Sequence, residues 1–370
     1  MTDGVIYLDN AATTWPKPPE LGHAMTQAIA DGLGNPHRSA HRLAMRSQAL
    51  LDELRDRVAT VVGTPDRTRV ILTPGCTDAI NIAINGVLAS EAHRFRPHIV
   101  TTTAEHNAVR RAIEWWRVED RADVVEVCCD ADGYVSADDI LDATCDRTVL
   151  VAMIHASNVT GALQPVEEVT RRLRAKRPNA LLHVDAAQTC GCLPMNVHTM
   201  DIDLLSIGAH KALLGPTGIG ALYVGPRVHD KDSGVNRIEP TRFGGTGDAG
   251  RADMPEGLPH RLEPGTPNLI AAAGWLGAMN AMPPADPGRL DHERALCARI
   301  ICRFIDDPRT RIPGPPASRR TPVVSMDLGP RPADTVATAL DASFGICVRA
   351  GFHCAPGVHD AMGCVGRPTL

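Results

Sequence analysis

The chain has 370 residues with 38 basic and 43 acidic side chains, so its formal net charge is -5. A charge this close to balance argues against a nucleic-acid or anionic-membrane surface. At 44% apolar and 22% charged, the composition is that of a globular protein with room for one large and one smaller domain, which excludes a disordered, collagenous or coiled-coil chain.

The chain carries neither a membrane span nor the cysteine pattern of a stapled or metal-bound fold. Its longest nearly apolar stretch, 269–282, is too short to cross a bilayer, and the first residues lack a signal-peptide core. We therefore expect a soluble, cytoplasmic protein. Eleven cysteines are too few for a disulfide scaffold, and without paired C-x-x-C spacing no metal is expected.

The first two thirds of the chain predict an α/β sheet. After an apolar run at 5–8, residues 41–62 place apolar side chains at helical spacing, which predicts a long amphipathic helix. Helices are also expected from Thr77 and His106. Short β-branched runs typical of buried strands lie at 70–73, 98–103, 124–128, 148–154, 180–185, 203–208 and 219–224. Strands separated by helices indicate βαβ units and a mostly parallel sheet.

The last third predicts a smaller α+β unit. Gly and Pro crowd into 227–267, which predicts a long irregular segment. Beyond it we expect helices over 269–282, 289–306 and 333–342 and strands over 321–328 and 346–350. The predicted division is a large cofactor-binding domain, 15–260, and a small domain formed by 1–14 and 261–370.

A possible phosphate site follows the strand at 70–73. There Gly75, Cys76 and Thr77 lie between a strand and a helix, where free N–H groups and a hydroxyl meet the positive end of the helix dipole. Threonine is also an ordinary cap residue, so a plain helix cap explains the same residues. Ligands of open α/β sheets bind beyond the carboxyl ends of the strands, which is where these residues lie.

Two further strand ends suit pyridoxal phosphate. Asp185 ends one strand and Lys211 follows the next, and this cofactor needs a lysine for attachment and an acid for its pyridine nitrogen. The alternative is that Asp185 caps a helix and Lys211 is a surface charge. Only four of the 38 basic residues are lysines, and the surroundings of Lys17, Lys176 and Lys231 predict that these three are solvated.

His106 and Cys354 are two more candidate functional residues. His106 begins a helix directly after a strand, where its ring could stack on a flat cofactor or simply cap the helix. Cys354 lies in a Gly/Pro loop with His353, Arg349 and His359 nearby in sequence. Cationic neighbours favour the thiolate that a nucleophile needs, whereas an inert loop cysteine is the alternative.

Taken together, these motifs resemble the cysteine desulfurases of the class V aminotransferase group, pyridoxal-phosphate enzymes of fold type I. The similarity runs from Tyr7 to Pro356 in the family's order. The matching stretches are YLDNAATTWPKPP, NPHRSAHRLA, TPGCTDAIN, AEHNAV, SNVTGALQPV, HVDAAQ, GAHKALLGPTGIG, FGGTG, RLEPGTPN and RAGFHCAP.

The resemblance implies a homodimer that binds pyridoxal phosphate, takes L-cysteine and passes sulfur to an acceptor protein. Lys211 would hold the cofactor and carry the substrate Cα proton, His106 would stack on the ring, and Cys354 would attack the substrate sulfur to give alanine and a persulfide. Further cofactor contacts are implied for Gly75, Cys76, Thr77, Asn158, Asp185, Gln188, His210 and, from the other subunit, Thr266. Substrate contacts are implied for Asn35, His41, Asn158 and Arg349.

Two departures from the family pattern leave other functions open. Relatives usually carry Ser or Thr at the position of Gly208, and one lost hydrogen bond to a charged group costs about 1.5–3 kcal/mol. The stretch VGRPTL also lacks the family's arginine clamp for the substrate carboxylate, which Arg367 or Arg349 would have to replace. The alternatives are a selenocysteine or cysteine-derivative lyase, a biosynthetic β-eliminase, and a non-catalytic scaffold.

Overall fold

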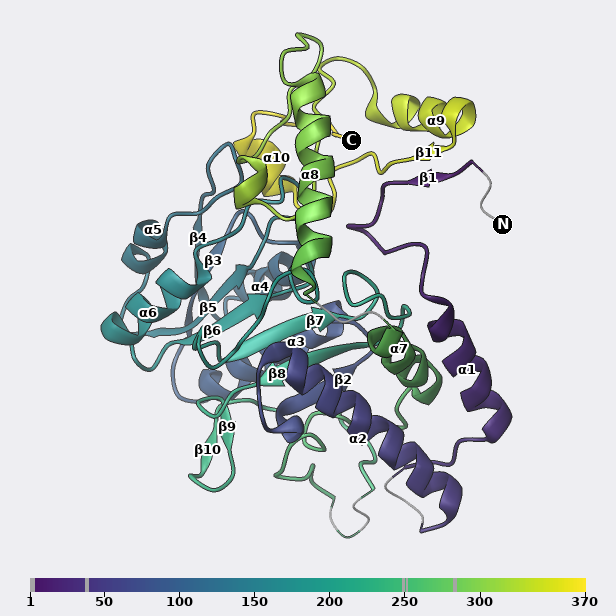
Figure 1. The fold of residues 1–370 in the computed structure, drawn as a ribbon. Coiled ribbons are helices and arrows are strands. Elements are labelled where there is room, and N and C mark those ends of the chain that lie inside the picture. The colour runs from purple at the N-terminus through teal and green to yellow at the C-terminus, as the bar shows by residue number, and fades with distance from the viewer. Residues whose placement is uncertain (1–3, 37–39, 248–249, 251, 282–284) are drawn as a thin grey trace.

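The structure is a computed structural model that describes residues 4–36, 40–247, 250, 252–281 and 285–370. Its centre is a seven-stranded sheet in the order β2-β8-β7-β6-β5-β3-β4 (Figure 1). Only β8 runs antiparallel to its neighbours, β2 and β7, so the expectation of a mostly parallel α/β sheet is confirmed. The strands are β2 (Val70–Thr73), β3 (His98–Thr102), β4 (Asp123–Val127), β5 (Thr148–Ile154), β6 (Leu181–Asp185), β7 (Leu204–Gly208) and β8 (Gly220–Val224).

Helices cover the sheet through two apolar clusters. One cluster joins the sheet to α2 (Arg42–Val62), α5 (Ala137–Asp142), α6 (Val166–Lys176) and α7 (Leu269–Ala281). The other joins it to α3 (Cys76–Ala92) and α4 (Asn107–Val118). Two buried faces explain why most strands are continuous apolar runs rather than alternating ones. The helices predicted from 41–62, Thr77 and His106 begin within one residue of those positions.

Helix α1 (Pro19–Asp31) packs against α7 at very short range (Figure 1). Two glycines of α7 make this possible. A Cβ on Gly277 would lie 2.8 Å from the Cβ of Ala24 and 2.8 Å from the carbonyl oxygen of Glu20, and a Cβ on Gly274 would lie 2.7 Å from the Cγ of Met25. The two helix backbones therefore approach more closely than any larger residue at these positions would permit.

The carboxyl-terminal part contains α8 (Pro287–Phe304), α9 (Ala333–Phe344) and α10 (Pro356–Ala361). Its β11 (Ile346–Cys347) pairs in parallel with β1 (Ile6–Tyr7), so the amino-terminal segment is attached to the carboxyl-terminal part. A short antiparallel hairpin of two-residue strands, β9 (His229–Asp230) and β10 (Val235–Asn236), interrupts the predicted irregular segment. The domain division itself remains a prediction.

The strand predicted over 321–328 is wrong. Proline at position 322 has no N–H for a ladder, and the residues around it bond to three different segments. Thr321 N donates to Gly161 O (2.9 Å), Met326 exchanges bonds with Leu370 (2.9 and 3.0 Å), and Asp327 exchanges bonds with Arg311 (2.8 and 2.9 Å). The segment is thus held by short contacts with several segments and has no continuous partner strand.

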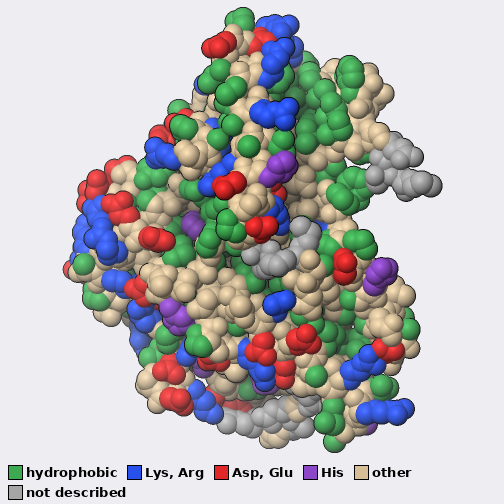
Figure 2. All heavy atoms as spheres, in the orientation of Figure 1, with side chains coloured by type: hydrophobic (Ala, Val, Ile, Leu, Met, Phe, Trp, Pro, Cys, Tyr) green, Lys and Arg blue, Asp and Glu red, His purple; other side chains and the backbone are tan. Residues whose placement is uncertain are grey.

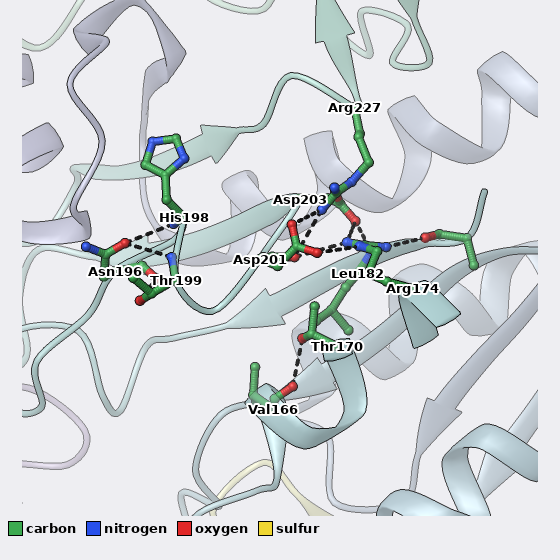
Figure 3. A network of polar contacts seen from close by, with 11 residues as sticks. Val166, Thr170, Arg174, Leu182, Asn196, His198, Thr199, Asp201, Asp203 and Arg227 are labelled. Atoms are coloured by element: carbon green, nitrogen blue, oxygen red, sulfur yellow. Dashed lines mark hydrogen bonds and ion pairs between the residues drawn. The ribbon is translucent and has the colours of Figure 1, made fainter. Parts of the chain in front are cut away.

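A buried charge network fixes the amino ends of β6 and β7 (Figure 3). Asp203, which is 1% exposed, accepts from Arg174 (2.5 Å), from Arg227 (2.8 Å) and from the Leu182 amide (2.7 Å). Arg174 also reaches Asp201 (2.9 Å). Since buried carboxylates need such pairing, the network ties α6, β6 and the turn before β7 into one unit at the end of the sheet opposite the strand ends described below.

The visible surface carries mixed charges, with red and blue side chains interspersed and no large patch of one sign (Figure 2). None of the helices among the described residues is both long and apolar enough to cross a membrane. All eleven cysteines are unpaired, as expected for a chain without a disulfide framework.

Candidate active site

Lys211 lies in the turn after β7, beside the strand that ends in Asp185. Strands β6 and β7 pair in parallel with Asp185 opposite Ser206, so both carboxyl ends open toward the same edge of the sheet. Burial lowers the pKa of the Lys211 ammonium, while the neighbouring Asp185 and Cys354 oppose this shift. A lowered pKa favours the neutral amine that covalent attachment and proton transfer require.

Asp185 is buried at the end of β6 and accepts two hydrogen bonds at one of its oxygens. The residue is 2% exposed, and its Oδ1 accepts from the Ala187 amide at 2.9 Å and from the Cys76 thiol at 3.6 Å. Burial, reinforced by Asp185, raises the pKa of the Cys76 thiol well above its usual value, so this sulfur stays protonated and donates. No helix begins at Asp185, which makes the helix-cap alternative wrong.

The amino end of α3 provides an open anion site. The N-cap residue of α3 is Gly75, which has no side chain, so Thr77 is not the residue that caps the helix. A Cβ on Gly75 would meet no atom within 4 Å, and a Cβ on Gly208 would meet the Cβ of Cys76 at 3.5 Å, an ordinary contact. First-turn N–H groups with free space above them suit a phosphate. Thr77 is exposed beside this space.

His210 faces the same region with an unused nitrogen. Its Nδ1 is buried without a hydrogen-bond partner among the described residues. Burial, aided by Lys211 and Lys17, lowers the pKa of His210 to about 4, so the ring is neutral and can donate one N–H. A buried polar atom without a partner calls for a ligand or water at that point.

The amino-terminal segment crosses the lysine turn and holds it. The carbonyl oxygen of His210 accepts from the Thr14 amide (3.0 Å), the Thr13 hydroxyl (3.3 Å) and the Lys17 ammonium (2.7 Å). The prediction that Lys17 is solvated is therefore wrong: it is partly buried, and burial lowers its pKa to about 8. The contact joins segments that are 193 residues apart in the chain.

His106 is the N-cap of α4, so the capping role considered for it is present. Its Nδ1 accepts from the Ala108 amide at 3.1 Å, and burial lowers its pKa, which keeps the ring neutral. The next residue, Asn107, donates its amide to the Cys354 carbonyl at 2.8 Å. The ring thus borders a cavity of about 730 Å³ that is also lined by Thr77, Arg111, Phe243 and Cys354.

The Cys354 loop has a constrained backbone. His353 and Cys354 have φ values of 49° and 60°, a left-handed conformation that costs roughly 1–2 kcal/mol per residue for side chains other than glycine. The Asn158 side-chain amide donates to the His353 carbonyl. An Arg349 guanidinium nitrogen lies 3.5 Å from the Cys354 sulfur, within hydrogen-bond distance of it.

Some predicted residues lie outside this group. Asn35 and Thr266 line a different cavity, of about 290 Å³. His41 is exposed, and its Nδ1 caps α2 by accepting from the Ala44 amide at 3.3 Å. Gln188 lies near the amino-terminal segment, where its Nε2 donates to the Ala11 carbonyl at 3.1 Å. Part of the stretch NPHRSAHRLA, residues 37–39, lies outside the described residues.

Asp9 and Lys17 are site neighbours that the sequence did not single out. Burial raises the pKa of Asp9, and the nearby charges of Arg349 and Lys211 oppose that shift. Both residues belong to YLDNAATTWPKPP, whose density of polar side chains near the start of the chain was the available signal.

Comparison with known proteins places this site in a family. Residues 6–366 match the family described as Aminotransferase class-V. A probable cysteine desulfurase of Streptomyces coelicolor is 31% identical over 95% of this chain and 83% of its own length. The cysteine desulfurase IscS of Dictyoglomus turgidum is 34% identical over 67% of this chain, and the match spans 62% of its length.

Two solved structures share the fold over nearly the whole chain. The apo cysteine desulfurase of Thermococcus onnurineus NA1 has a TM-score of 0.86 at 27% identity and covers 99% of this chain and 88% of its own. The cysteine desulfurase CsdA of Escherichia coli has a TM-score of 0.85 at 26% identity and covers 100% and 90%. The chain belongs to the class-V aminotransferase family. Within that family it is a cysteine desulfurase, with the expected fold of type I pyridoxal-phosphate enzymes.

Proposed function

We propose that this chain binds pyridoxal phosphate and transfers the sulfur of L-cysteine to Cys354, releasing L-alanine and leaving a persulfide. The observation that carries the proposal is the convergence of Lys211, Asp185 and Cys354 on one site: the carboxylate and the thiol are both electrostatic neighbours of the buried lysine. In the overall reaction the substrate C–S bond breaks and a bond forms between that sulfur and the Cys354 sulfur, which gives up its proton. The former sulfur-bearing carbon gains one proton, and the proton taken from Cα is restored.

The residues present fit the cofactor. The open amino end of α3 with Thr77, and the unpartnered Nδ1 of His210, would hold the phosphate. Asp185 would keep the pyridine nitrogen protonated, and His106 would face the ring. When bound, pyridoxal phosphate supplies an electron sink for the charge that develops at the substrate Cα. Gly75 and Cys76 contribute backbone and close approach at the phosphate, and Gln188 is proposed as a donor to the ring oxygen.

The chain's own side chains would move the protons and the sulfur. Lys211, with its lowered pKa, would take the Cα proton as a neutral amine. The Cys354 thiolate, next to Arg349, would attack the substrate sulfur. Asn158 keeps a buried Oδ1 without a partner among the described residues, which supports a contact with the bound amino acid. Arg349 is the proposed ligand of the substrate carboxylate.

We also propose a homodimer in which Thr266 serves the partner's site. Thr266 and Asn35 line a cavity different from the one at Cys354. The geometry therefore does not support a role for Thr266 in the site of its own subunit. Phe243, which is 78% exposed, stands at the mouth of the Cys354 cavity and would be covered by a second copy. Substrate contacts for Asn35 and His41, an acceptor protein for the sulfur, and a cytoplasmic location remain predictions.

The test uses the purified protein loaded with pyridoxal phosphate. Incubation with L-cysteine and a thiol reductant should release sulfide and alanine in equal amounts, and Cys354→Ala and Lys211→Ala should each lose nearly all of both. Cys302→Ala, which changes an exposed cysteine of α8, is the matched control and should behave as wild type.

Other outcomes separate the alternative functions. Sulfide release that survives Cys354→Ala would contradict the persulfide route and favour a lyase that eliminates its leaving group directly. A stronger preference for selenocysteine or a cysteine derivative in a substrate panel would reassign the substrate. Failure to bind pyridoxal phosphate at all would favour the scaffold.

A further inference from the structure

We propose that the Thr369 hydroxyl is a positioning group for the Cys354 nucleophile, because it joins His353 and His359 and thereby fixes the backbone that carries the thiol. The inference rests on the proposed function in taking Cys354 as the nucleophile. It adds a residue that belongs to none of the motifs on which the resemblance to the family was based.

Thr369 contacts the Cys354 loop through both its side chain and its main chain. The residue is fully buried. Its Oγ1 lies 3.1 Å from Nε2 of His353 and 3.2 Å from Nε2 of His359. Its amide donates to the Gly351 carbonyl at 3.1 Å, and its carbonyl accepts from the Gly351 amide at 3.0 Å. The loop is therefore pinned on both sides of Phe352 by one residue.

The hydroxyl can serve both imidazoles only in a directed chain. It has one proton, so it donates to one ring and accepts from the other. Burial lowers the pKa of both histidines, that of His353 to about 4, so both rings are neutral. We assign the His359 proton to Nδ1, which lies 3.4 Å from the Ala355 carbonyl. The His359 Nε2 then accepts from Thr369, and His353 donates its Nε2–H to the Thr369 oxygen.

This chain of bonds acts at the residue before the nucleophile. Two successive residues with positive φ persist only where the surroundings over-determine them. Asn158 and Asn107 hold the carbonyl groups of His353 and Cys354, respectively. Thr369 holds the His353 side chain, which the two asparagines leave untouched. Fixing that side chain completes the restraint and keeps the Cys354 sulfur beside Arg349.

A structural hydroxyl and a positioning hydroxyl make different predictions. If Thr369 only filled space and satisfied buried nitrogen atoms, its loss would weaken the whole fold. If it positions the loop, its loss should increase local opening around Cys354 without affecting distant elements. Threonine and valine have the same shape, and serine keeps the hydroxyl while losing a methyl group, so Thr369→Val and Thr369→Ser separate bonding from packing.

The experiment measures hydrogen–deuterium exchange in the full-length protein loaded with pyridoxal phosphate. In Thr369→Val, peptides covering 349–356 should exchange at least about five- to tenfold faster than in wild type, which is the effect of one lost hydrogen bond, because the variant loses the bonds to both imidazoles. In Thr369→Ser, the same peptides should exchange at a rate within about twofold of wild type, because serine keeps the hydroxyl. Peptides covering β6 and β7 should be unchanged in both. Thr338→Val, which removes an exposed hydroxyl on α9, is the matched control and should leave the loop unchanged.

A kinetic measurement complements the exchange experiment. For sulfide release from L-cysteine, Thr369→Val should lower kcat by about five- to tenfold with a KM within about twofold of wild type, because the thiol rather than substrate binding is disturbed. Loop exchange unchanged in Thr369→Val, or raised equally in β6 and β7, would overturn the proposal. Absence of sulfide release from wild type would refute the proposed function instead, and exchange would still decide the role of Thr369.

Discussion

The Lys17 ammonium donates a hydrogen bond to the carbonyl oxygen of His210, 2.7 Å away and next to Lys211. The two residues are 193 positions apart in the chain. The contact turns the segment before α1 into a wall of the site, where Thr13 and Thr14 bond to the same carbonyl. One backbone oxygen thus anchors the turn that carries the attachment lysine.

The buried position of Lys17 predicts an unusual titration. Burial lowers its pKa to about 8, whereas an unfolded lysine keeps its proton to about 10.5. Between these pH values the unfolded state binds more protons, so this group makes the free energy of unfolding rise with pH there. Per-residue acetylation followed by mass spectrometry should give Lys17 a midpoint near pH 8. Exposed Lys176 is the internal reference, and identical profiles for the two lysines would contradict the buried position.

Gly208→Ser should tighten cofactor binding. A Cβ at this position meets the Cβ of Cys76 at 3.5 Å and His210 at 3.6 Å, so the side chain fits without a shift of the backbone. Its hydroxyl would add a hydrogen bond to the proposed phosphate. One such bond should raise the affinity for pyridoxal phosphate by about tenfold. Equilibrium dialysis of pyridoxal phosphate measures the change. Gly257→Ser, with no atom within 4 Å of the added Cβ, is the control, and equal affinities for the two variants would count against a phosphate at Gly208.

Arg349 should accelerate reactions of the Cys354 sulfur. The guanidinium lies 3.5 Å from it, but both residues are partly exposed, so solvent screening limits the effect. We expect Arg349→Met to slow iodoacetamide alkylation of Cys354 at neutral pH by about two- to fivefold. Peptide mapping separates Cys354 from the other ten thiols. Arg349→Lys, which keeps the charge, should slow the alkylation of Cys354 less than Arg349→Met does. An unchanged alkylation rate in Arg349→Met would exclude electrostatic activation.

Asp203→Asn tests the network at the opposite end of the sheet (Figure 3). The carboxylate is 1% exposed and holds Arg174, Arg227 and the Leu182 amide. Breaking a buried ion pair leaves an uncompensated charge and costs about 3–5 kcal/mol, which urea unfolding would measure. Glu168→Gln, in an exposed pair with Arg172, should cost less than about 1 kcal/mol. Equal costs for the two changes would contradict the structural role of the network.

The sheet was predictable because its strands are buried on both faces. Continuous apolar runs such as 148–154 have no other low-energy arrangement between two helical layers. Predictions failed where the pattern was short and the partner distant. The stretch 321–328 was predicted as a strand, yet its bonds go to Gly161, Arg311 and Leu370, three segments that no local signal connects.

The residues of the site also fall into two groups, those that could be placed from the sequence and those that could not. Asp185 and Lys211 follow adjacent parallel strands, so topology alone brings them together. Lys17 and Thr369 could not be placed from sequence, because each reaches the site through a tertiary contact with a segment far along the chain. Lys17 looked solvated beside its prolines, and nothing around Thr369 distinguishes it from an ordinary tail residue.

The close contact of α1 with α7 makes the lysine turn sensitive to changes made far from it. Helix α1 begins two residues after Lys17, so the position of the helix sets where that ammonium can reach. Any side chain added at Gly277 must push against the Ala24 Cβ and the Glu20 carbonyl. The resulting shift of α1 would also move the segment before it, which carries Lys17. A scan for residues that alter the reaction would therefore find α7 among its hits, although it contributes no side chain to the chemistry.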